Sequence, residues 1–130
     1  MKVLAIDYGR KKIGVAVANS ESNLAEPLSV IRFETQEEAI KRVSEIAKIE
    51  NVAKVIVGVS EGEMAKETKM FGKKLEEELK IAVIYQDETL STQEAQVLSI
   101  KAKIKRKKRR ELEDAYSAAL ILQNYLDNVK

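Results

Sequence analysis

Short apolar runs separated by turn residues fill the first quarter of the chain and predict three strands. Residues 3–6 and 13–18 form two such runs, and the polar residues 8–12 between them are typical of a hairpin connection. A third strand is expected over residues 24–33. Because Pro27 cannot donate a hydrogen bond to a neighbouring strand, this third strand is best placed at an edge of the sheet.

Helical spacing of apolar residues replaces this pattern after residue 35. Thr35 and Glu38 form a capping box at the start of the first expected helix, and Ser60 and Glu63 form another before the second. Ser91 begins a third helix that runs to about residue 100. The apolar stripes of the first, second and last expected helices are Ala39, Ile40, Val43, Ile46 and Ala47, then Met64, Thr68, Phe71, Leu75 and Leu79, then Leu112, Ala115, Ala119, Leu122 and Leu126.

Two further apolar runs, over residues 54–59 and 81–85, alternate with these helices. Strand–helix alternation is typical of parallel strands covered by helices, whereas three consecutive strands suggest an antiparallel meander. The sequence therefore predicts an α/β protein with a five-stranded mixed sheet, three strands antiparallel and two added in parallel. At 130 residues, we expect residues 1–130 to form one domain.

Acidic residues follow three of the predicted strands. Asp7 ends the first, Glu61 follows the fourth, and Asp87 and Glu88 follow the fifth. If these strands run parallel, their carboxyl ends meet at one edge, and carboxylates gathered there repel one another unless a cation compensates. Asp114 lies at the margin of the last helix's apolar arc and adds to this group, although an acid in a first turn also complements the helix dipole.

The absence of histidine and cysteine narrows the chemistry of any such site. Thiol and imidazole nucleophiles, Cys/His zinc sites, haem and iron–sulfur clusters are excluded within this chain. A metal ion would have to bind oxygen ligands, which favours Mg²⁺ or Mn²⁺. Clustered carboxylates without histidine favour phosphodiester chemistry on such ions.

The nearly neutral net charge of +2 hides a dense basic run at residues 101–110. Eight of its ten residues are basic, so the rest of the chain carries an acidic excess. We expect this segment to be exposed, mobile and bound to a polyanion, the alternative being a solvated linker between two helices. The candidate contacts to nucleic acid are Lys105, Arg106, Lys107, Lys108, Arg109 and Arg110 in this run, and Arg10, Lys11 and Lys12 near the first strand.

No apolar run approaches the length of a membrane span, and the first residues are charged too early for a signal peptide. We therefore expect a cytoplasmic protein without a membrane partner. Aromatic residues are scarce, so recognition of RNA through its backbone and shape is expected rather than base stacking.

Four blocks of sequence, in order, resemble the YqgF family, also called RuvX. They are residues 6–17 (IDYGRKKIGVAV), residues 57–62 (VGVSEG), residues 87–95 (DETLSTQEA) and residues 114–126 (DAYSAALILQNYL). The resemblance implies a ribonuclease H-like fold and a metal-dependent nuclease that processes the 5′ end of precursor 16S ribosomal RNA. An older inference for the family is resolution of Holliday junctions.

The resemblance also implies roles for particular residues. Asp7 matches the family's first-strand acid and Asp114 its last-helix acid, while Glu88 is the favoured middle acid, with Asp87 beside it and Glu61 as a rival. Asp7 would then bridge two divalent ions that clamp the scissile phosphate. The chain departs from the family in two places. The loop between its Val-Gly and Ser-Glu-Gly is shortened to one residue, and Thr89 replaces the arginine after Asp-Glu.

Several functions are compatible with these features. The leading hypothesis is an endonuclease on structured RNA, as a monomer or weak homodimer. Alternatives are a resolvase acting on branched DNA, a non-catalytic RNA-binding assembly factor, and an ATPase of the actin and hexokinase type. The ATPase architecture needs two such domains around its nucleotide.

Overall fold

The fold is described from a computed structural model that places residues 1–19, 21, 24–87 and 112–128. The helix expected after Ser91 and the basic run at 101–110 lie outside these described residues. The described elements are β1 (Lys2–Tyr8), β2 (Lys12–Asn19), β3 (Leu24–Arg32), α1 (Gln36–Glu50), β4 (Val52–Val59), α2 (Glu63–Leu79), β5 (Ala82–Asp87) and α5 (Glu113–Asn128).

The five strands form one mixed sheet in the order β3-β2-β1-β4-β5. β1 pairs antiparallel with β2, and β2 with β3, while β4 and β5 add in parallel, which confirms the predicted meander and its parallel extension. β3 is an edge strand, as Pro27 required. The pairing with β2 shifts register here, since Val15 faces Ser29 whereas Ala16 faces Pro27, so Leu28 is the extra residue of a bulge.

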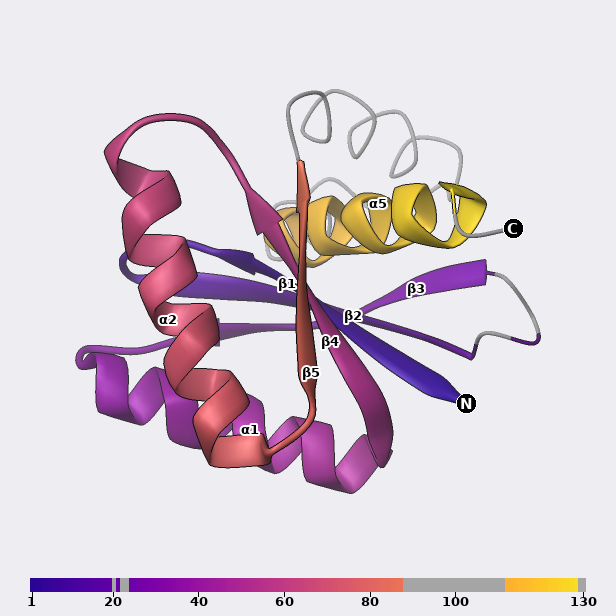
Figure 1. Ribbon diagram of the computed structural model, residues 1–130, viewed down its shortest axis with the longest axis horizontal. Coiled ribbons are helices and arrows are strands. Elements are labelled where there is room, and N and C mark those ends of the chain that lie inside the picture. Colours follow the sequence, from indigo (N-terminus) through magenta and orange to yellow (C-terminus); the bar gives the residue numbers. More distant parts are fainter. Residues whose placement is uncertain (20, 22–23, 88–111, 129–130) are drawn as a thin grey trace.

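Helices cover both faces of the sheet (Figure 1). The two faces carry side chains of different size. On the α1 and α2 face, large residues such as Leu4, Ile6 and Phe71 form the core. On the α5 face the strands present mainly small residues, among them Ala5 and Ala16. Small side chains let a helix lie close to the sheet, so α5 packs more closely than a leucine-rich face would allow.

α5 approaches the sheet very closely at Gly14, which lies in the second residue pair from the turn of the hairpin formed by β1 and β2. A Cβ atom built on Gly14 would lie 1.8 Å from the backbone oxygen of Asp114 and 2.8 Å from the backbone nitrogen of Ala115. No side chain fits at these distances, and the atoms that it would meet belong to a helix backbone. Gly14 therefore fixes where the first turn of α5 rests on the sheet.

One of the two predicted capping boxes is present in a modified form and the other is wrong. Thr35 caps α1 by accepting a hydrogen bond from the Glu38 N–H at 3.1 Å, and the Glu38 carboxylate accepts from the Glu34 N–H at 2.8 Å. The box expected from Ser60 and Glu63 does not form. α2 begins at Glu63 itself, and its N-cap is Gly62 at φ 84°, where glycine meets no steric cost.

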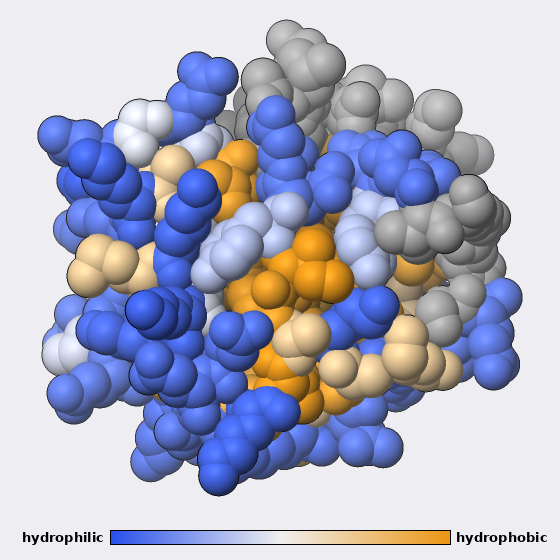
Figure 2. Space-filling view, in the orientation of Figure 1, coloured by the Kyte–Doolittle hydropathy of each residue, from blue (hydrophilic) through white to orange (hydrophobic). Residues whose placement is uncertain are grey.

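β5, the outer strand on the side of the sheet opposite to β3, is only partly covered by the helices. Its residues are half-buried or exposed, and Tyr85 is 40% exposed. Figure 2 shows apolar surface in the part of the view where Figure 1 places β5, surrounded by hydrophilic residues. Within the described ranges, no helix is long and apolar enough to cross a membrane.

The contact at Gly14 predicts that adding a single methyl group there strongly lowers the stability of the fold. Gly14→Ala should lower the free energy of unfolding by about 3 kcal/mol or more, because helix backbone must move to admit the Cβ. The matched change is Gly72→Ala in α2, where the Cβ would meet the Tyr85 hydroxyl at 2.7 Å. The Tyr85 ring, whose Cε1 would lie 2.9 Å away, is partly exposed and can turn aside at the cost of its hydrogen bond to Lys69. Alanine also favours the helix, so a smaller change of about 1 kcal/mol is expected there.

Urea unfolding of both variants checks this contrast. Equal effects of the two substitutions would show that α5 does not depend on close contact with Gly14.

Candidate active site at the carboxyl edge of the sheet

The carboxyl ends of three parallel strands meet at one edge of the sheet. β1 ends at Tyr8, β4 at Val59 and β5 at Asp87, and the antiparallel β2 begins at this same edge with Lys12. Ligands of open α/β sheets bind outside the carboxyl ends of such strands. The described acidic candidates all lie near this edge, so the topology brings together residues that are far apart in sequence.

Asp7 and Asp114 both lie next to Gly14. Asp7 is the direct cross-strand partner of Gly14 in the β1–β2 ladder. Side chains alternate along a strand, so Asp7 lies on the same face as Val3 and Ala5, which pack under α5. The Asp114 backbone rests on Gly14 from that face. The first-strand acid and the last-helix acid are therefore neighbours, and both are half-buried.

A lysine accompanies this pair. The Lys12 ammonium lies 3.0 Å from Oδ2 of Asp114, with the side chains 45% and 29% exposed, respectively. Lys12 precedes Gly14 by two residues and so lies on the same face of β2. Lys12 thus places a positive charge next to the Asp114 carboxylate.

Residues at the β1–β2 turn contact α2, on the face of the sheet opposite to α5. The Tyr8 ring packs on Phe71 with centroids 4.6 Å apart, and lies 6.4 Å from the Phe33 ring. Arg10 forms an ion pair with Glu67 of α2, with 3.0 Å between its Nε and the carboxylate oxygen. This hydrogen bond raises the pKa of Arg10 above its ordinary value. Of the predicted nucleic-acid contacts, Arg10 is thereby directed toward α2.

Asp87 and Glu61 share a different part of the edge. Asp87 pairs with Val59 and follows Val83 and Tyr85 on the face that α2 covers, opposite to Asp7. With Glu61, Asp87 lines a shallow cleft of about 320 Å³ that also includes Ser60, Lys69, Tyr85 and Gln86. The Tyr85 hydroxyl donates to the Lys69 carbonyl oxygen at 3.1 Å, and burial raises the pKa of Tyr85.

The remaining site candidates lie outside the described residues. They are Glu88, the favoured middle acid, and Lys105, Arg106, Lys107, Lys108, Arg109 and Arg110 of the basic run. Among the residues that the structure places, no three acidic side chains form a group able to hold a metal ion. Asp7 and Asp114 place two acidic residues on one face of the sheet.

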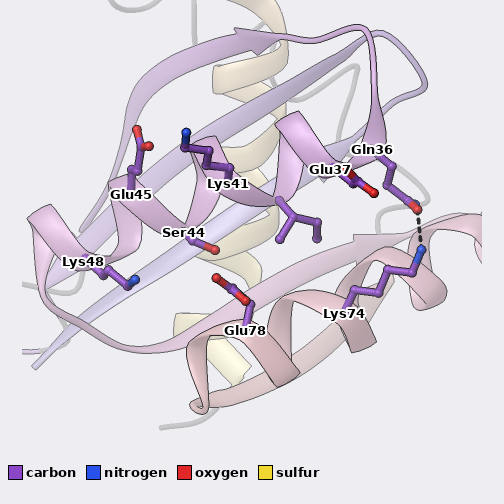
Figure 3. A pocket seen from close by; sticks show the side chains of 9 residues that line it. Gln36, Glu37, Lys41, Ser44, Glu45, Lys48, Lys74 and Glu78 are labelled. Carbon is purple, nitrogen blue, oxygen red and sulfur yellow. Dashed lines mark hydrogen bonds between the residues drawn. The ribbon is translucent and has the colours of Figure 1, made fainter.

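A larger cleft lies between α1 and α2 (Figure 3), and none of these acids lines it. It has a volume of about 700 Å³ and is lined by side chains of both charges, including Lys41, Glu45 and Glu78. Lys74 donates a hydrogen bond across it to Gln36 at 2.8 Å. We place the candidate active site at the carboxyl edge instead, because an open edge can admit a polymer and holds the paired acids.

Sequence reasoning missed two parts of this site. The first is the role of Gly14, whose contact with α5 positions Asp114. A glycine inside a strand is a signal of close backbone approach and could have indicated this contact. Lys12 was expected only as a nucleic-acid contact, because an ion pair between residues 102 positions apart leaves no local sequence pattern.

The fold belongs to the ribonuclease H-like class. The chain superposes on RuvC of Thermus thermophilus in complex with a Holliday junction substrate, with a TM-score of 0.68, 19% identity and coverage of 100% of this chain and 97% of that one. The Fowlpox virus resolvase in complex with Holliday junction DNA also gives a TM-score of 0.68, at 15% identity, covering 99% of both chains.

The family follows from sequence. The family model described as "RuvX: Holliday junction resolvase" matches residues 1–128, and this chain belongs to that family. A relative from Caldanaerobacter subterraneus, named "Putative pre-16S rRNA nuclease", is 38% identical, covering 100% of this chain and 99% of the relative. A relative of the same name from Bacillus cytotoxicus is 36% identical, with 98% and 99% covered.

The geometry of the lysine–aspartate pair predicts a small coupling energy. In a double-mutant cycle of Lys12→Met and Asp114→Asn, we expect about 1 kcal/mol between the two side chains, the upper end for an ion pair whose partners are both partly exposed to water. Urea unfolding of the four proteins measures it at low ionic strength. Coupling above about 2 kcal/mol would mean that the pair is far more buried than described.

Proposed function

We propose that this chain is a divalent-metal-dependent endonuclease that processes the 5′ end of precursor 16S ribosomal RNA. The observation that carries the proposal is the contact at Gly14, which brings Asp114 beside Asp7 at the carboxyl edge of the sheet. The name shared by the relatives supports the choice of precursor ribosomal RNA as substrate.

The donor set fits Mg²⁺ or Mn²⁺. Both described donors are carboxylates, histidine and cysteine are absent from the sequence, and hard divalent ions prefer oxygen ligands. Asp7 and Asp114 would hold the metal together with Glu88, the favoured middle acid. When bound, such ions activate a water molecule and stabilise the leaving oxygen of the cleaved phosphodiester.

The chain's own residues have two tasks around that chemistry. Asp7 and Asp114 position the cation on the α5 face, fixed by the β1–β2 ladder and by the first turn of α5. The basic run at 101–110 and the exposed Lys11 supply positive charge for the RNA backbone. Because phosphate contacts carry no base preference, this arrangement favours recognition by backbone and shape.

A second candidate is resolution of Holliday junctions, which the family's description and the two resolvase neighbours favour. Precursor 16S RNA and a four-way DNA junction, offered in parallel with Mg²⁺, with Mn²⁺ and with chelator, separate the two. We expect metal-dependent cleavage of the RNA. Preferential cleavage of the junction would favour a resolvase, and RNA binding without cleavage would indicate an assembly factor.

Replacing the first-strand acid should remove activity without unfolding the protein. Asp7→Asn should reduce metal-dependent cleavage at least about 100-fold, because it removes a direct metal ligand. Its unfolding free energy without metal should equal or slightly exceed that of the wild type, since a carboxylate beside Asp114 is neutralised. Cleavage rates and urea unfolding measure the two effects.

The same assay compares the middle acids. Glu88→Gln should lose as much activity as Asp7→Asn, whereas Asp87→Asn and Glu61→Gln should each retain a larger fraction, because Asp87 and Glu61 line a cleft on the other side of the sheet edge. Full activity of Asp7→Asn, or its failure to fold, would remove Asp7 from the metal site.

The basic run should control the salt dependence of RNA binding. With about four to six phosphate contacts at a slope near −0.7 each, log affinity against log salt should fall with a slope of about −3 to −4 on single-stranded RNA. Changing Lys105, Arg106, Lys107 and Lys108 together to Gln should flatten this slope, with fluorescence anisotropy as the measurement.

A matched control removes four charges elsewhere. Lys41, Lys48, Lys73 and Lys74 lie on α1 and α2, and their change to Gln should leave the slope nearly unaltered. An unaltered slope in the first variant would identify the basic run as a solvated linker.

A further inference from the structure

We infer that Lys12 is a resident cation of the metal site, bound to Asp114 when no metal is present and displaced from it when a divalent ion binds. Lys12 is thus a positioning residue that sets how tightly the site takes up its metal. The inference rests on the proposed function in one respect, namely that Asp7 and Asp114 are metal ligands.

The backbone places Lys12 at this carboxylate. β2 runs antiparallel to β1, so it begins at the edge where β1 ends, and Lys12 is its first residue. Gly14 lies two residues further along the same face and supports the first turn of α5, which carries Asp114. The 3.0 Å contact between Lys12 and Asp114 therefore joins two elements whose relative position is fixed by packing.

The charges explain why a cation belongs there in the absence of metal. Asp7 and Asp114 both lie next to Gly14 on one face, and carboxylates placed near each other repel unless a cation offsets their charge. The Lys12 ammonium offsets this repulsion at Asp114. Arg10, in the turn of this hairpin, is bound to Glu67 of α2 instead.

The same charges indicate that a metal ion displaces the Lys12 ammonium from Asp114 and does not bind beside it. A divalent ion on Asp114 would stand within a few ångströms of the Lys12 ammonium, and like charges at that separation repel even in water. Lys12 is 45% exposed, so its flexible side chain can turn into solvent without disturbing the core. Metal uptake therefore includes the cost of breaking the ion pair, and removing Lys12 removes that cost.

The test is a calorimetric titration of the metal-free protein with Mn²⁺ alone, without RNA, at low ionic strength. Lys12→Met should bind Mn²⁺ about threefold to tenfold more tightly than the wild type. Lys12→Arg, which keeps the charge, should stay within about twofold of the wild type. Lys11→Met is the matched control, because Lys11 is the neighbouring residue, carries the same charge and has an exposed side chain. The Mn²⁺ affinity of this variant should change by less than about twofold.

A second variant and a second readout guard against a folding defect. Lys12→Ala should repeat the tighter binding, and far-UV circular dichroism checks that each variant is folded. Without metal, Lys12→Met should melt at a slightly lower temperature than the wild type, and saturating Mn²⁺ should abolish or reverse the difference, because the ion then takes over the role of the ammonium.

The outcomes separate this inference from the proposed function. Wild-type binding of Mn²⁺ with unchanged or weaker binding by Lys12→Met and Lys12→Ala would overturn the exchange and leave the metal site intact. Equal tightening by Lys11→Met would also overturn it, since the effect would then be diffuse charge. Failure of the wild type to bind Mn²⁺ would overturn both the exchange and the metal-dependent nuclease.

Discussion

The close contact between α5 and Gly14 is the constraint on which the candidate site depends. Asp7 belongs to the sheet and Asp114 to a helix more than one hundred residues later, so only the packing of that helix brings them together. The backbone of Asp114 rests where a side chain on β2 would otherwise stand. The small residues of the α5 face, such as Ala5 and Ala16, extend this close packing along the sheet.

Much of this fold was predictable because its signals are local. Apolar runs identified the five described strands, helical spacing identified α1, α2 and α5, and Pro27 identified β3 as an edge strand. The start of α2 was not predictable from its residue types, because Ser60 and Glu63 fit a capping box while the backbone turns at Gly62. Sequence patterns indicate which residues favour an N-cap position, but they do not decide at which residue the backbone takes the N-cap conformation.

The site was predictable in its residue types and less so in its geometry. Strand ends indicated that Asp7, Glu61 and Asp87 share an edge, and the structure places them there. It also separates them by face, since Asp87 lies on the α2 side and Asp7 on the α5 side. A shift of one residue changes the face of a strand residue, so that distinction depends on the exact register. The pairing of Lys12 with Asp114 depends on tertiary packing and had no local signal.

In the function proposed above, Asp7 and Asp114 bind one metal ion on the α5 face of the sheet. Anomalous diffraction from crystals soaked in Mn²⁺ tests it most directly, because it locates the ion without reference to activity or substrate. We expect a peak within bonding distance of both carboxylates, with the Lys12 ammonium turned away from Asp114. A peak confined to the cleft of Glu61 and Asp87, or no peak beside Asp7, would contradict it.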